Sequence, residues 1–435
     1  MTARDARAVP VVTHRPPKAP PPRVVASPRM TALGDAVRRD GDRAAAAFWD
    51  EVAERGTPLV EPGDGPDARI ATFLWRDRHG AAPGTRAVLL MANKLTDPSV
   101  WEASTLERLP GTDVWHRSYL LPADWRATYQ LAADDGPEPP AEGEGPPGPG
   151  RRWRGMAALA AADPLNSRRF PGRAGGAPLS VAELPDAPAL PRPVPAGAPR
   201  GTVTRGRLPP AALGAPRDAW LYVPAGVPAG PMPLAVVFDG EDWCGRLDLP
   251  AILDGLIAEG AVPPLVAVLP DSVDVATRWR DLTCDAAFER FVVDELIPWA
   301  AARAWVTGDP DRTIVAGQSL GGLTALHLLL SGGRFGAAVV QSASLWWSPD
   351  GDATDGGWLG ALAASAAPAT VHLEVGSEEW ALIDQHRRLR DALRSAGHRV
   401  TYGEYSGGHD AICWRSAMAE GLERVAGTWG PAARG

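Results

Sequence analysis

The segment TIVAGQSLGGLTALHLLL (residues 313–330) places a serine between a short β-type run and an apolar helical pattern. Gly317 and Gly321 flank Ser319 two residues to either side, which gives the pattern G-x-S-x-G. In a nucleophile elbow, such glycines make room for a tight strand-to-helix turn that exposes the serine hydroxyl. The next backbone N–H, here that of Leu320, then faces the site of a developing oxyanion. The alternative is a serine that only caps the helix, so a nucleophilic role requires a base and an acid elsewhere in the chain.

A histidine lies where the matching base is expected. His409, in the segment YSGGHDAICW, follows the last β-type run of the chain. The chain order of nucleophile, acid and histidine is the order found in α/β-hydrolases, so we predict that His409 is the general base. His372, His386 and His398 fall within or beside regular elements, and we expect structural roles for them.

The acid of the triad is expected just after the run TVHLEVG (residues 370–376). A carboxylate at this point holds the imidazole in the required tautomer and stabilises the imidazolium that forms. We favour Glu379, with Glu378 as the second choice and Glu374 as the third. The alternative is a glutamate that only caps the following helix.

The loop FDGEDW (residues 238–243) follows another apolar run and is the expected source of a second oxyanion donor. Gly240 lets the backbone turn an N–H group inward, so we assign this role to the N–H of Gly240 or Glu241. We expect Asp239 to bond to the backbone and to shape the loop.

The elements around these residues predict the fold. From about Gly201 onward, β-type runs such as PLAVVFDG alternate with helical patterns such as LIDQHRRLRDALRSAG. This alternation is typical of an α/β fold with a doubly wound, mostly parallel sheet, here an α/β-hydrolase. The first half begins with a helix that ends at Gly56. It continues with short, part-alternating runs that predict a small β-sandwich-like domain: ARIATFLWRD, RAVLLMANK, DVWHRSYLL and RATYQLAA.

The expected divisions of the chain are a disordered tail, an N-terminal domain, a linker and a C-terminal domain: residues 1–30, 31–190, 191–200 and 201–435. The tail is rich in Pro and Arg and lacks the apolar core of a secretory signal. A basic nucleic-acid-binding arm is the alternative for it, and translation starts at either Met1 or Met30. Residues 134–152 (DDGPEPPAEGEGPPGPGRR) are expected to form a disordered insertion within the N-terminal domain.

The overall composition argues against several classes of function. A formal net charge of −8 disfavours general affinity for nucleic acid or anionic membranes. No apolar run reaches the roughly 18 residues of a membrane-spanning helix. The three cysteines, an odd number without CxxC spacing, argue against a disulfide framework or a zinc site and favour a reducing cytoplasm. Neither an HExxH pair nor a GxxxxGK[ST] loop is present, so the sequence predicts neither a metal site nor a nucleotide site.

Segments from both halves of the chain resemble those of the enterochelin (enterobactin) esterases, which open ferric catecholate siderophores after uptake. The N-terminal half carries FWDEVAERGTPLVEP, ATFLWRD, LERLPGTDVWHRSYLLPADWRATYQL and DPLN in the order of that family. The C-terminal half carries FDGEDW, RWRDLTC, AGQSLGGLTAL, QSASLWW and GGHDAICWR. PGTDVWHRSY and GGHDAICWR are far more specific than the serine motif. The proline-rich tail (residues 1–30) and the insertion at residues 134–152 depart from the pattern of the family.

The resemblance implies hydrolysis of a cyclic tri-serine lactone whose serines carry catechol amides, with Ser319 as nucleophile and His409 as base. It implies no bound cofactor, and iron arrives only as part of the substrate, a ferric catecholate siderophore. Two other uses of the site stay open: a biosynthetic thioesterase or acyltransferase acting on a peptidyl or aryl ester, and a siderophore-binding protein without activity. The sequence predicts neither the oligomeric state nor which trilactone is the substrate.

A ferric tris-catecholate carries about three negative charges, and a protein of net charge −8 repels it unless the entrance to the site is locally basic. We therefore expect arginines and tryptophans near the catalytic loops to bind the substrate by charge and by stacking. The candidates are Arg278, Arg280, Arg415, Trp243, Trp346, Trp347 and Trp414. For each of them the alternative is a structural role, in a local ion pair or in core packing.

Overall fold

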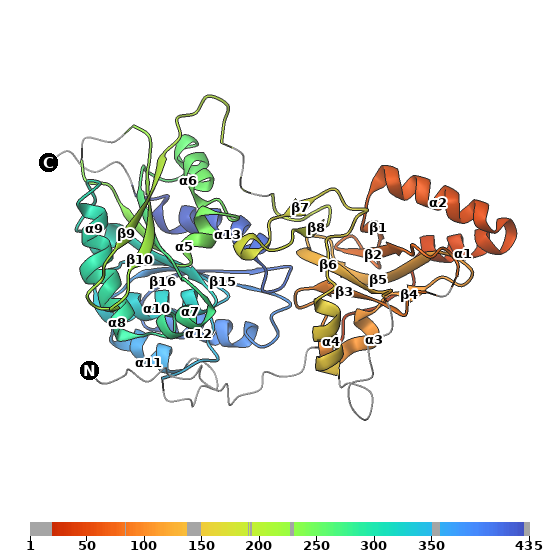
Figure 1. Ribbon diagram of the computed structural model, residues 1–435. Coiled ribbons are helices and arrows are strands. Elements are labelled where there is room, and N and C mark those ends of the chain that lie inside the picture. The colour runs from red at the N-terminus through yellow and green to blue at the C-terminus, as the bar shows by residue number, and fades with distance from the viewer. Residues whose placement is uncertain are drawn as a thin grey trace. The chain divides into compact units, whose positions relative to one another are not determined.

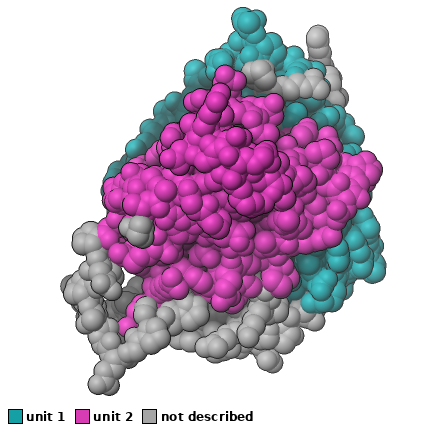
Figure 2. Space-filling view, turned by 90° about the vertical axis from the view of Figure 1, so that its right-hand side faces the viewer, with its two compact units in different colours: residues 1–17, 189–405, 414–435 teal, residues 18–188, 406–413 magenta. Residues whose placement is uncertain are grey.

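The computed structural model describes residues 20–82, 84–136, 149–189, 191, 194–226, 230–349 and 357–429. The chain divides into two compact units, which are coloured separately in Figure 2. The N-terminal unit comprises Lys18–Pro188 together with Ser406–Cys413. The C-terminal unit comprises Ala189–Tyr405 and the chain from Trp414 onward. Sequence patterns did not indicate that the segment 406–413 belongs to the N-terminal unit.

Two segments that were expected to be disordered are partly helical where the structure describes them. Residues 1–19 of the expected tail and 137–148 of the expected insertion lie outside the described residues. Helix α1 begins at Pro28, because the side chain of Ser27 accepts a hydrogen bond from the first turn and proline is favoured at the start of a helix. Helix α4 (Pro149–Ala157) covers the end of the expected insertion.

The N-terminal unit consists of short strands and peripheral helices: α1 (Pro28–Asp40), α2 (Asp42–Arg55), β1 (Leu59–Pro62), β2 (Ala68–Arg76), β3 (Ala87–Ala92), α3 (Trp101–Ser104), β4 (Glu107–Arg108), β5 (Val114–Pro122), β6 (Arg126–Asp134), α4, β7 (Arg169–Phe170) and β8 (Leu179–Glu183). The strands form two antiparallel sheets with the orders β1-β2-β5-β4 and β3-β6-β8-β7. The single opening helix that the sequence predicts is divided into α1 and α2, because Gly41 interrupts it with φ 56° and ψ −137°.

Both sheets of this unit contribute to one hydrophobic core. Phe73 of β2 and Tyr119 of β5 come from the first sheet, Tyr129 of β6 comes from the second, and all three side chains are fully buried. The ring of Phe73 packs edge-on against both tyrosines, with centroid distances of 5.9 and 4.9 Å. Two sheets that share one core make a sandwich, so the predicted β-sandwich-like domain is confirmed.

The C-terminal unit alternates strands with helices (Figure 1): β9 (Thr202–Leu208), β10 (Arg217–Val223), β11 (Leu234–Val237), α5 (Gly240–Cys244), α6 (Leu249–Ala258), β12 (Val266–Pro270), α7 (Val275–Asp281), α8 (Ala286–Arg290), a π-helical turn (Phe291–Leu296), α9 (Ile297–Ala301), β13 (Thr313–Gln318), α10 (Leu320–Gly332), β14 (Ala337–Gln341), α11 (Gly357–Ser365), β15 (Thr370–Gly376), α12 (Ile383–Ser395), β16 (Arg399–Tyr405) and α13 (Ala411–Ala426). The strands form one sheet with the order β16-β15-β14-β13-β11-β12-β10-β9. Neighbours from β16 to β12 run parallel, whereas β10 is antiparallel to both β12 and β9.

Helices cover both faces of this sheet, so every residue of its central strands β11, β13 and β14 is buried. Val315 and Val340 face a core that also contains residues of α10, α11 and α12. Val339 points to the opposite face, where α13 packs so closely that a Cβ atom at Gly421 would lie 2.5 Å from it. The predicted doubly wound, mostly parallel sheet is confirmed. None of the helices in the described parts of the chain is long and apolar enough to cross a membrane.

The strand order places the candidate chemistry at one edge of the sheet. The connection from β11 leads to β12 on one side, and the connection from β12 returns to β13 on the other side of β11. The direction of winding therefore changes between β11 and β13, and ligand sites of open α/β sheets form outside the carboxyl ends of strands at such a point. The loop with Asp239 and Gly240 follows β11, and Ser319 follows β13.

Candidate active site

Ser319 occupies the turn between β13 and α10 in a conformation that non-glycine residues rarely adopt. Its backbone angles are φ 58° and ψ −122°, and such a conformation costs about 1–3 kcal/mol. The turn is so tight that a Cβ atom at Gly317 would lie 2.5 Å from the carbonyl carbon of Gly321. The side chain of Ser319 is only half-buried, although the strand before it is buried throughout. This is the backbone geometry that the G-x-S-x-G pattern predicts.

The segment after β14 holds this turn in place. The N–H of Ser319 donates to the carbonyl of Gln341 (2.9 Å), and its carbonyl accepts from the N–H groups of Leu323 (3.1 Å) and Ser344 (3.0 Å). The hydroxyl oxygens of Ser319 and Ser344 lie 3.3 Å apart. Sequence reasoning missed Ser344, and the only signal for it was the run QSAS at the end of an expected strand.

Three histidines have structural roles, as predicted. His386 is fully buried, and its Nε2 accepts a hydrogen bond from the N–H of Ala343 (2.9 Å), next to Ser344. This imidazole therefore supports the segment that anchors the serine turn. His372 and His398 are also buried, and both of their ring nitrogens have hydrogen-bond partners.

Glu379 has the environment of a buried carboxylate. Its side chain is 1% exposed. One of its oxygens, Oε1, lies within hydrogen-bond distance of the N–H of Gly376 (2.9 Å), the hydroxyl of Ser342 (2.6 Å) and the hydroxyl of Tyr405 (3.1 Å). Hydrogen bonds of this kind stabilise the charged form of a carboxyl group and fix its direction. Glu379 follows β15, so it lies at the same edge of the sheet as Ser319.

The third-choice acid, Glu374, has another role. Its two oxygens lie near the side-chain amide of Gln341 (2.6 Å) and the imidazole of His372 (3.2 Å). Both partners come from the interior of the sheet, and this carboxylate ties β15 to β14. Glu378, the second choice, is half-buried between Ser377 and Glu379. Of the three, Glu379 combines burial with the most hydrogen-bond donors at one oxygen, and its role as the acid stays a prediction.

The loop after β11 turns sharply at Asp239 and Gly240. Asp239 adopts the left-handed conformation, with φ 59° and ψ 50°. A Cβ atom at Gly240 would lie 2.6 Å from the carbonyl oxygen of Leu269, so only glycine fits. The N–H groups of Gly240 and Glu241 lie in the first turn of helix α5. These are the two groups that the sequence assigns as the second oxyanion donor.

Asp239 shapes this loop through its backbone carbonyl, which accepts from the N–H groups of Asp242 (3.0 Å) and Trp243 (3.1 Å), and also through its side chain. The carboxylate is 1% exposed and accepts from the hydroxyl of Ser272 (2.6 Å) and the side-chain amide of Gln318 (2.8 Å). It also accepts from Nε (2.5 Å) and a terminal nitrogen (2.8 Å) of Arg278. Because Gln318 directly precedes Ser319, this network joins the expected oxyanion loop to the serine turn.

Glu241 adds a half-buried carboxyl group to the same loop. Its Oε2 accepts from the N–H of Ser272 (3.0 Å). Burial and the neighbouring charge of Asp239 raise the pKa of Glu241 to about 7. The loop therefore contains one carboxylate that is neutralised by Arg278 and one carboxyl group that resists ionisation.

His409 lies half-buried in the segment 406–413, which the N-terminal unit holds. The carboxylate of Asp410 accepts from both the N–H (2.6 Å) and the hydroxyl (2.8 Å) of Thr128 on β6. The carbonyl of Ser406 accepts from the N–H of Arg126 (3.1 Å). A Cβ atom at Gly408 would clash with the backbone oxygen of Asn93, so this glycine permits close approach to the N-terminal unit.

The three arginines predicted to bind substrate all have partners within the protein. Arg278 is largely buried and pairs with Asp239. Arg280 pairs with Asp281 (2.9 Å), and its side chain remains 55% exposed. Arg415 is half-buried and donates from Nε to the carbonyl of Leu247 (3.1 Å). Their roles in binding stay predictions, and the ion pair of Arg278 gives it a structural role in addition.

The four predicted tryptophans divide into two groups. Trp243 is fully buried and donates to the side-chain oxygen of Gln318 (2.9 Å). Trp414 is 9% exposed and donates to the hydroxyl of Ser342 (3.1 Å). Both indoles thus support the loops of the site from within and leave little or no ring surface exposed for stacking, so their roles in binding stay predictions. Trp346 and Trp347 are half-buried and keep accessible ring surface.

Sequence reasoning missed the aromatic partners of the half-buried Trp346 and Trp347. Trp346 lies against Trp279 of α7, with ring centroids 5.8 Å apart. Trp347 packs edge-on against Trp358 of α11, with centroids 6.0 Å apart. These contacts build an aromatic surface within the C-terminal unit from elements that are distant in sequence.

Comparisons with known proteins agree with this architecture. The family model for the N-terminal domain of enterochelin esterases matches residues 70–192, and the Esterase family model matches residues 211–425. An iron(III) enterobactin esterase of Dickeya dadantii is 38% identical over 86% of this chain and 92% of its own. An iron(III) salmochelin esterase of Escherichia coli O6:H1 is 32% identical over 87% of this chain and 93% of its own.

A solved structure covers the same extent. The enterobactin esterase from Shigella flexneri, crystallised in the presence of enterobactin, has a TM-score of 0.72 and 29% identity to this chain. The match covers 87% of this chain and 97% of that one. Both domains are therefore matched together and in order. With an elbow serine, a histidine after the last strand and this extent of similarity, the chain belongs to the enterochelin esterase family.

Proposed function

We propose that this protein is a serine esterase that hydrolyses the trilactone ester bonds of a ferric catecholate siderophore of the enterobactin type. The observation that carries the proposal is the conformation of Ser319, which has φ 58° at the carboxyl end of β13 in a chain of this family. Strained backbone persists only where the surrounding structure enforces it, and it gathers at catalytic residues.

In this reaction Ser319 attacks a lactone carbonyl while His409 removes the proton from its hydroxyl. The developing oxyanion is stabilised by the N–H of Leu320 and by an N–H from Gly240 or Glu241. Glu379 orients the imidazole of His409 and stabilises its protonated form. The alkoxide of the opened ring leaves with the proton from His409, and a water molecule then releases the acyl group from Ser319 as a linear chain.

Helix α10, which begins directly after Ser319, favours the development of negative charge on the oxyanion. Helix α10 extends over 13 residues, and its first free N–H groups carry the positive end of the helix dipole. The carbonyl of Ser319 is occupied by two donors, from Leu323 and Ser344, so the turn has little freedom to move during attack. A donor that is already in place costs no reorganisation energy when the oxyanion forms.

The substrate class follows from charge and aromatic surface as well as from family. Arg280 keeps more than half of its side chain exposed, and Trp346 and Trp347 keep accessible rings. A ferric tris-catecholate of about three negative charges gains from cations and flat aromatic faces. Bond cleavage by this route requires no resident cofactor, because iron is part of the substrate. We also propose a cytoplasmic location, since Cys244, Cys284 and Cys413 are all free thiols.

Mass spectrometry of the products tests the proposal directly. The protein is incubated with ferric enterobactin and, in a parallel reaction, with a ferric salmochelin. Linear trimer, dimer or monomer that appears with the wild-type protein supports ester hydrolysis, and the faster of the two reactions identifies the preferred trilactone. Acyl-transfer products formed with an added amine or alcohol, or a ligand that is bound but unaltered, would contradict it.

A further inference from the structure

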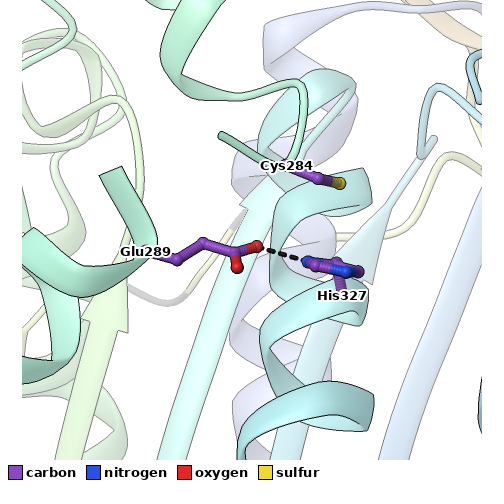
Figure 3. A group of neighbouring side chains, drawn as sticks. All are labelled: Cys284, Glu289 and His327. Carbon is purple, nitrogen blue, oxygen red and sulfur yellow. Dashed lines mark hydrogen bonds and ion pairs between the residues drawn. The ribbon is translucent and has the colours of Figure 1, made fainter. Parts of the chain in front are cut away.

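Three side chains with metal-binding atoms come together in the C-terminal unit, away from the residues assigned to catalysis (Figure 3). Cys284 lies in the turn between α7 and α8, Glu289 lies on α8, and His327 lies on α10. The thiol sulfur, a carboxylate oxygen and a ring nitrogen all lie within 4.8 Å of one another. All three residues are half-buried. In Figure 3, Glu289 and Cys284 both point toward the ring of His327.

We propose that Cys284, Glu289 and His327 form a binding site for a divalent transition-metal ion of the zinc class. Thiolate, imidazole and carboxylate are the three protein ligands of zinc, whereas magnesium and calcium select oxygen ligands throughout. A tetrahedral zinc ion, with bonds of about 2.0–2.3 Å, places its ligand atoms about 3.3–3.6 Å apart. Metal binding therefore requires the close Glu289–His327 pair to separate and the more widely spaced atoms, up to 4.8 Å apart, to approach by about 1 Å, movements that side-chain rotation supplies.

Glu289 and His327 already hold two of the three candidate ligand atoms close together. A carboxylate oxygen of Glu289 faces Nδ1 of His327 in a short contact. At this separation a proton lies between the two atoms, and a metal ion would take its place as the atoms move apart. On metal binding, that bridging proton and the proton of the Cys284 thiol are released to solvent, and no oxidation or reduction takes place.

The surroundings of the thiol provide a second observation. The hydroxyl of Thr324, which lies one turn before His327 on α10, is fully buried and lies within hydrogen-bonding reach of the thiol of Cys284. A hydroxyl in this position is able to donate to a metal-bound thiolate, which is the kind of outer contact that orients metal ligands. On the other side, the ring of Trp358 lies 5.6 Å from that of His327 and shields it from water.

The bound ion would have a structural role. It would link the turn that follows α7, the helix that carries Arg278, to α10, the helix that begins next to Ser319. Such a link stabilises two of the elements that hold the expected oxyanion loop and the serine turn. The site differs from the iron of the substrate in its ligands and in its place in the fold, so the inference does not depend on the proposed esterase activity.

No sequence motif predicts this site. Cys284 and Glu289 are separated by four residues and His327 comes from another helix, so none of the short spacings of known zinc motifs is present. The competing explanation is a simple ion pair between α8 and α10 with a thiol packed beside it. The two explanations differ in whether a metal ion binds with a sulfur ligand.

Cobalt(II) titration distinguishes these explanations, because a thiolate–cobalt bond gives a near-ultraviolet charge-transfer band that oxygen and nitrogen ligands do not give. The full-length protein is reduced, stripped with a chelator and titrated without siderophore. We expect one equivalent of cobalt to bind with this band, and one equivalent of zinc to displace it. Absence of the band in the folded wild-type protein, or binding of well under one equivalent, would overturn the proposal without any variant.

Variants locate the ion. Cys284→Ser should lose the band, and His327→Gln should lower zinc affinity by at least about 100-fold, measured by competition with a chromophoric chelator. Cys244→Ser is the matched control, because Cys244 is also a half-buried free thiol but lies outside the cluster. The band should be unchanged in this control. A band that persists in Cys284→Ser and disappears in Cys244→Ser would place the metal elsewhere and contradict the assignment.

Discussion

Ser319 has a backbone conformation that its own side chain does not favour, and its neighbours supply the contacts that maintain it. Gln341, Leu323 and Ser344 occupy its N–H and carbonyl groups, and Gly317 permits the close crossing of the chain. Together these contacts outweigh a strain of about 1–3 kcal/mol. The serine and its flanking glycines could be recognised in the sequence because the turn imposes a local pattern. Ser344 and His386 could not, because they act from other strands and helices.

At the residue scale, Glu379 and Glu374 offer a matched pair of buried glutamates in β15 and the turn after it. We expect Glu379→Gln to lower kcat by about 10²–10⁴-fold, since it removes the charge that stabilises the imidazolium of His409. Glu374→Gln should change kcat less than about threefold, because that carboxylate only ties β15 to β14. The measurement is the steady-state rate on a p-nitrophenyl ester. Equal rates for Glu379→Gln and wild type would move the acid to Glu378.

Side-chain burial was the property that the sequence predicted least well. Trp243 and Trp346 both lie near loops of the expected site, and their sequence contexts gave no reason to separate them. The structure buries Trp243 completely against Gln318 and leaves Trp346 partly exposed. Trp243 lies on α5, which packs against β12 and β10, whereas Trp346 lies against Trp279 of α7. Only the three-dimensional arrangement of the strands determines this.

At the scale of elements, Arg278 connects the loop after β11 to the end of β13. We expect Arg278→Lys to lower kcat by about 10-fold or more while KM changes little, because lysine cannot reproduce the two parallel bonds to Asp239. A residue that bound the substrate would instead raise KM and weaken the affinity for ferric siderophore. Kinetics on both a small ester and the siderophore measure this difference.

Arg280→Lys is the control for this prediction. Arg280 lies on the same helix, but its own side chain is 55% exposed and its partner Asp281 is held as well by the buried Arg217. We expect no change of kcat on the small ester for this variant. A selective increase of KM in Arg278→Lys, without loss of kcat, would contradict a positioning role and restore the role in substrate binding.

The segment 406–413 is the element whose position the sequence did not predict. It follows β16 in the chain, yet Asp410 accepts two hydrogen bonds from Thr128 of the N-terminal unit. A sequence pattern specifies which residues form a loop but not which distant strand holds it. The motif GGHDAICW therefore pointed to His409 as a candidate base, which stays a prediction, without revealing why an aspartate and a glycine accompany it.

This arrangement predicts that the N-terminal unit affects catalysis itself and not only binding of the siderophore. Thr128→Val removes the hydroxyl bond to Asp410, so we expect the rate to fall by about 3- to 30-fold on the siderophore and on a p-nitrophenyl ester alike. The matched control is Thr72→Val, which breaks the buried bond between Thr72 and Ser118 (2.8 Å) in the other sheet. Full activity of Thr128→Val on the small ester would show that the segment is held by other contacts.

At the scale of the whole molecule, Glu241 makes stability depend on pH. Burial raises its pKa to about 7, above the value of about 4.3 in an unfolded chain. The folded state therefore binds the proton more tightly, and this contribution to stability is full below about pH 4.3 and is lost as pH rises through 7. Glu241→Gln changes the free energy of unfolding relative to the wild type. We expect this change to be about 1–3 kcal/mol more stabilising at pH 8 than at pH 5.

Urea unfolding of the two proteins at both pH values measures this difference. The same substitution at the exposed Glu54 serves as the control. If Glu241→Gln changes the free energy of unfolding equally at pH 5 and pH 8, the carboxyl group is ionised in the folded protein and the raised pKa is wrong.

The overall architecture could be predicted from the sequence because its signals are local and repeated. Alternating strands and helices indicate a parallel sheet, and short alternating runs indicate a sandwich. Strand order was not predictable in the same way, since the return from β12 across β11 to β13 depends on contacts far apart in the chain. Because β13 lies next to β11, the loop with Gly240 and the turn with Ser319 lie at the same edge of the sheet.

The central claim is that Ser319 is the nucleophile of an ester hydrolase. We expect Ser319→Ala to lower the rate of ferric enterobactin hydrolysis by about 10⁴- to 10⁶-fold. The affinity for the intact siderophore, measured by quenching of tryptophan fluorescence, should change less than about threefold, because the oxyanion donors and binding surface remain. A Ser319→Ala protein that keeps a tenth or more of the wild-type rate would contradict the account.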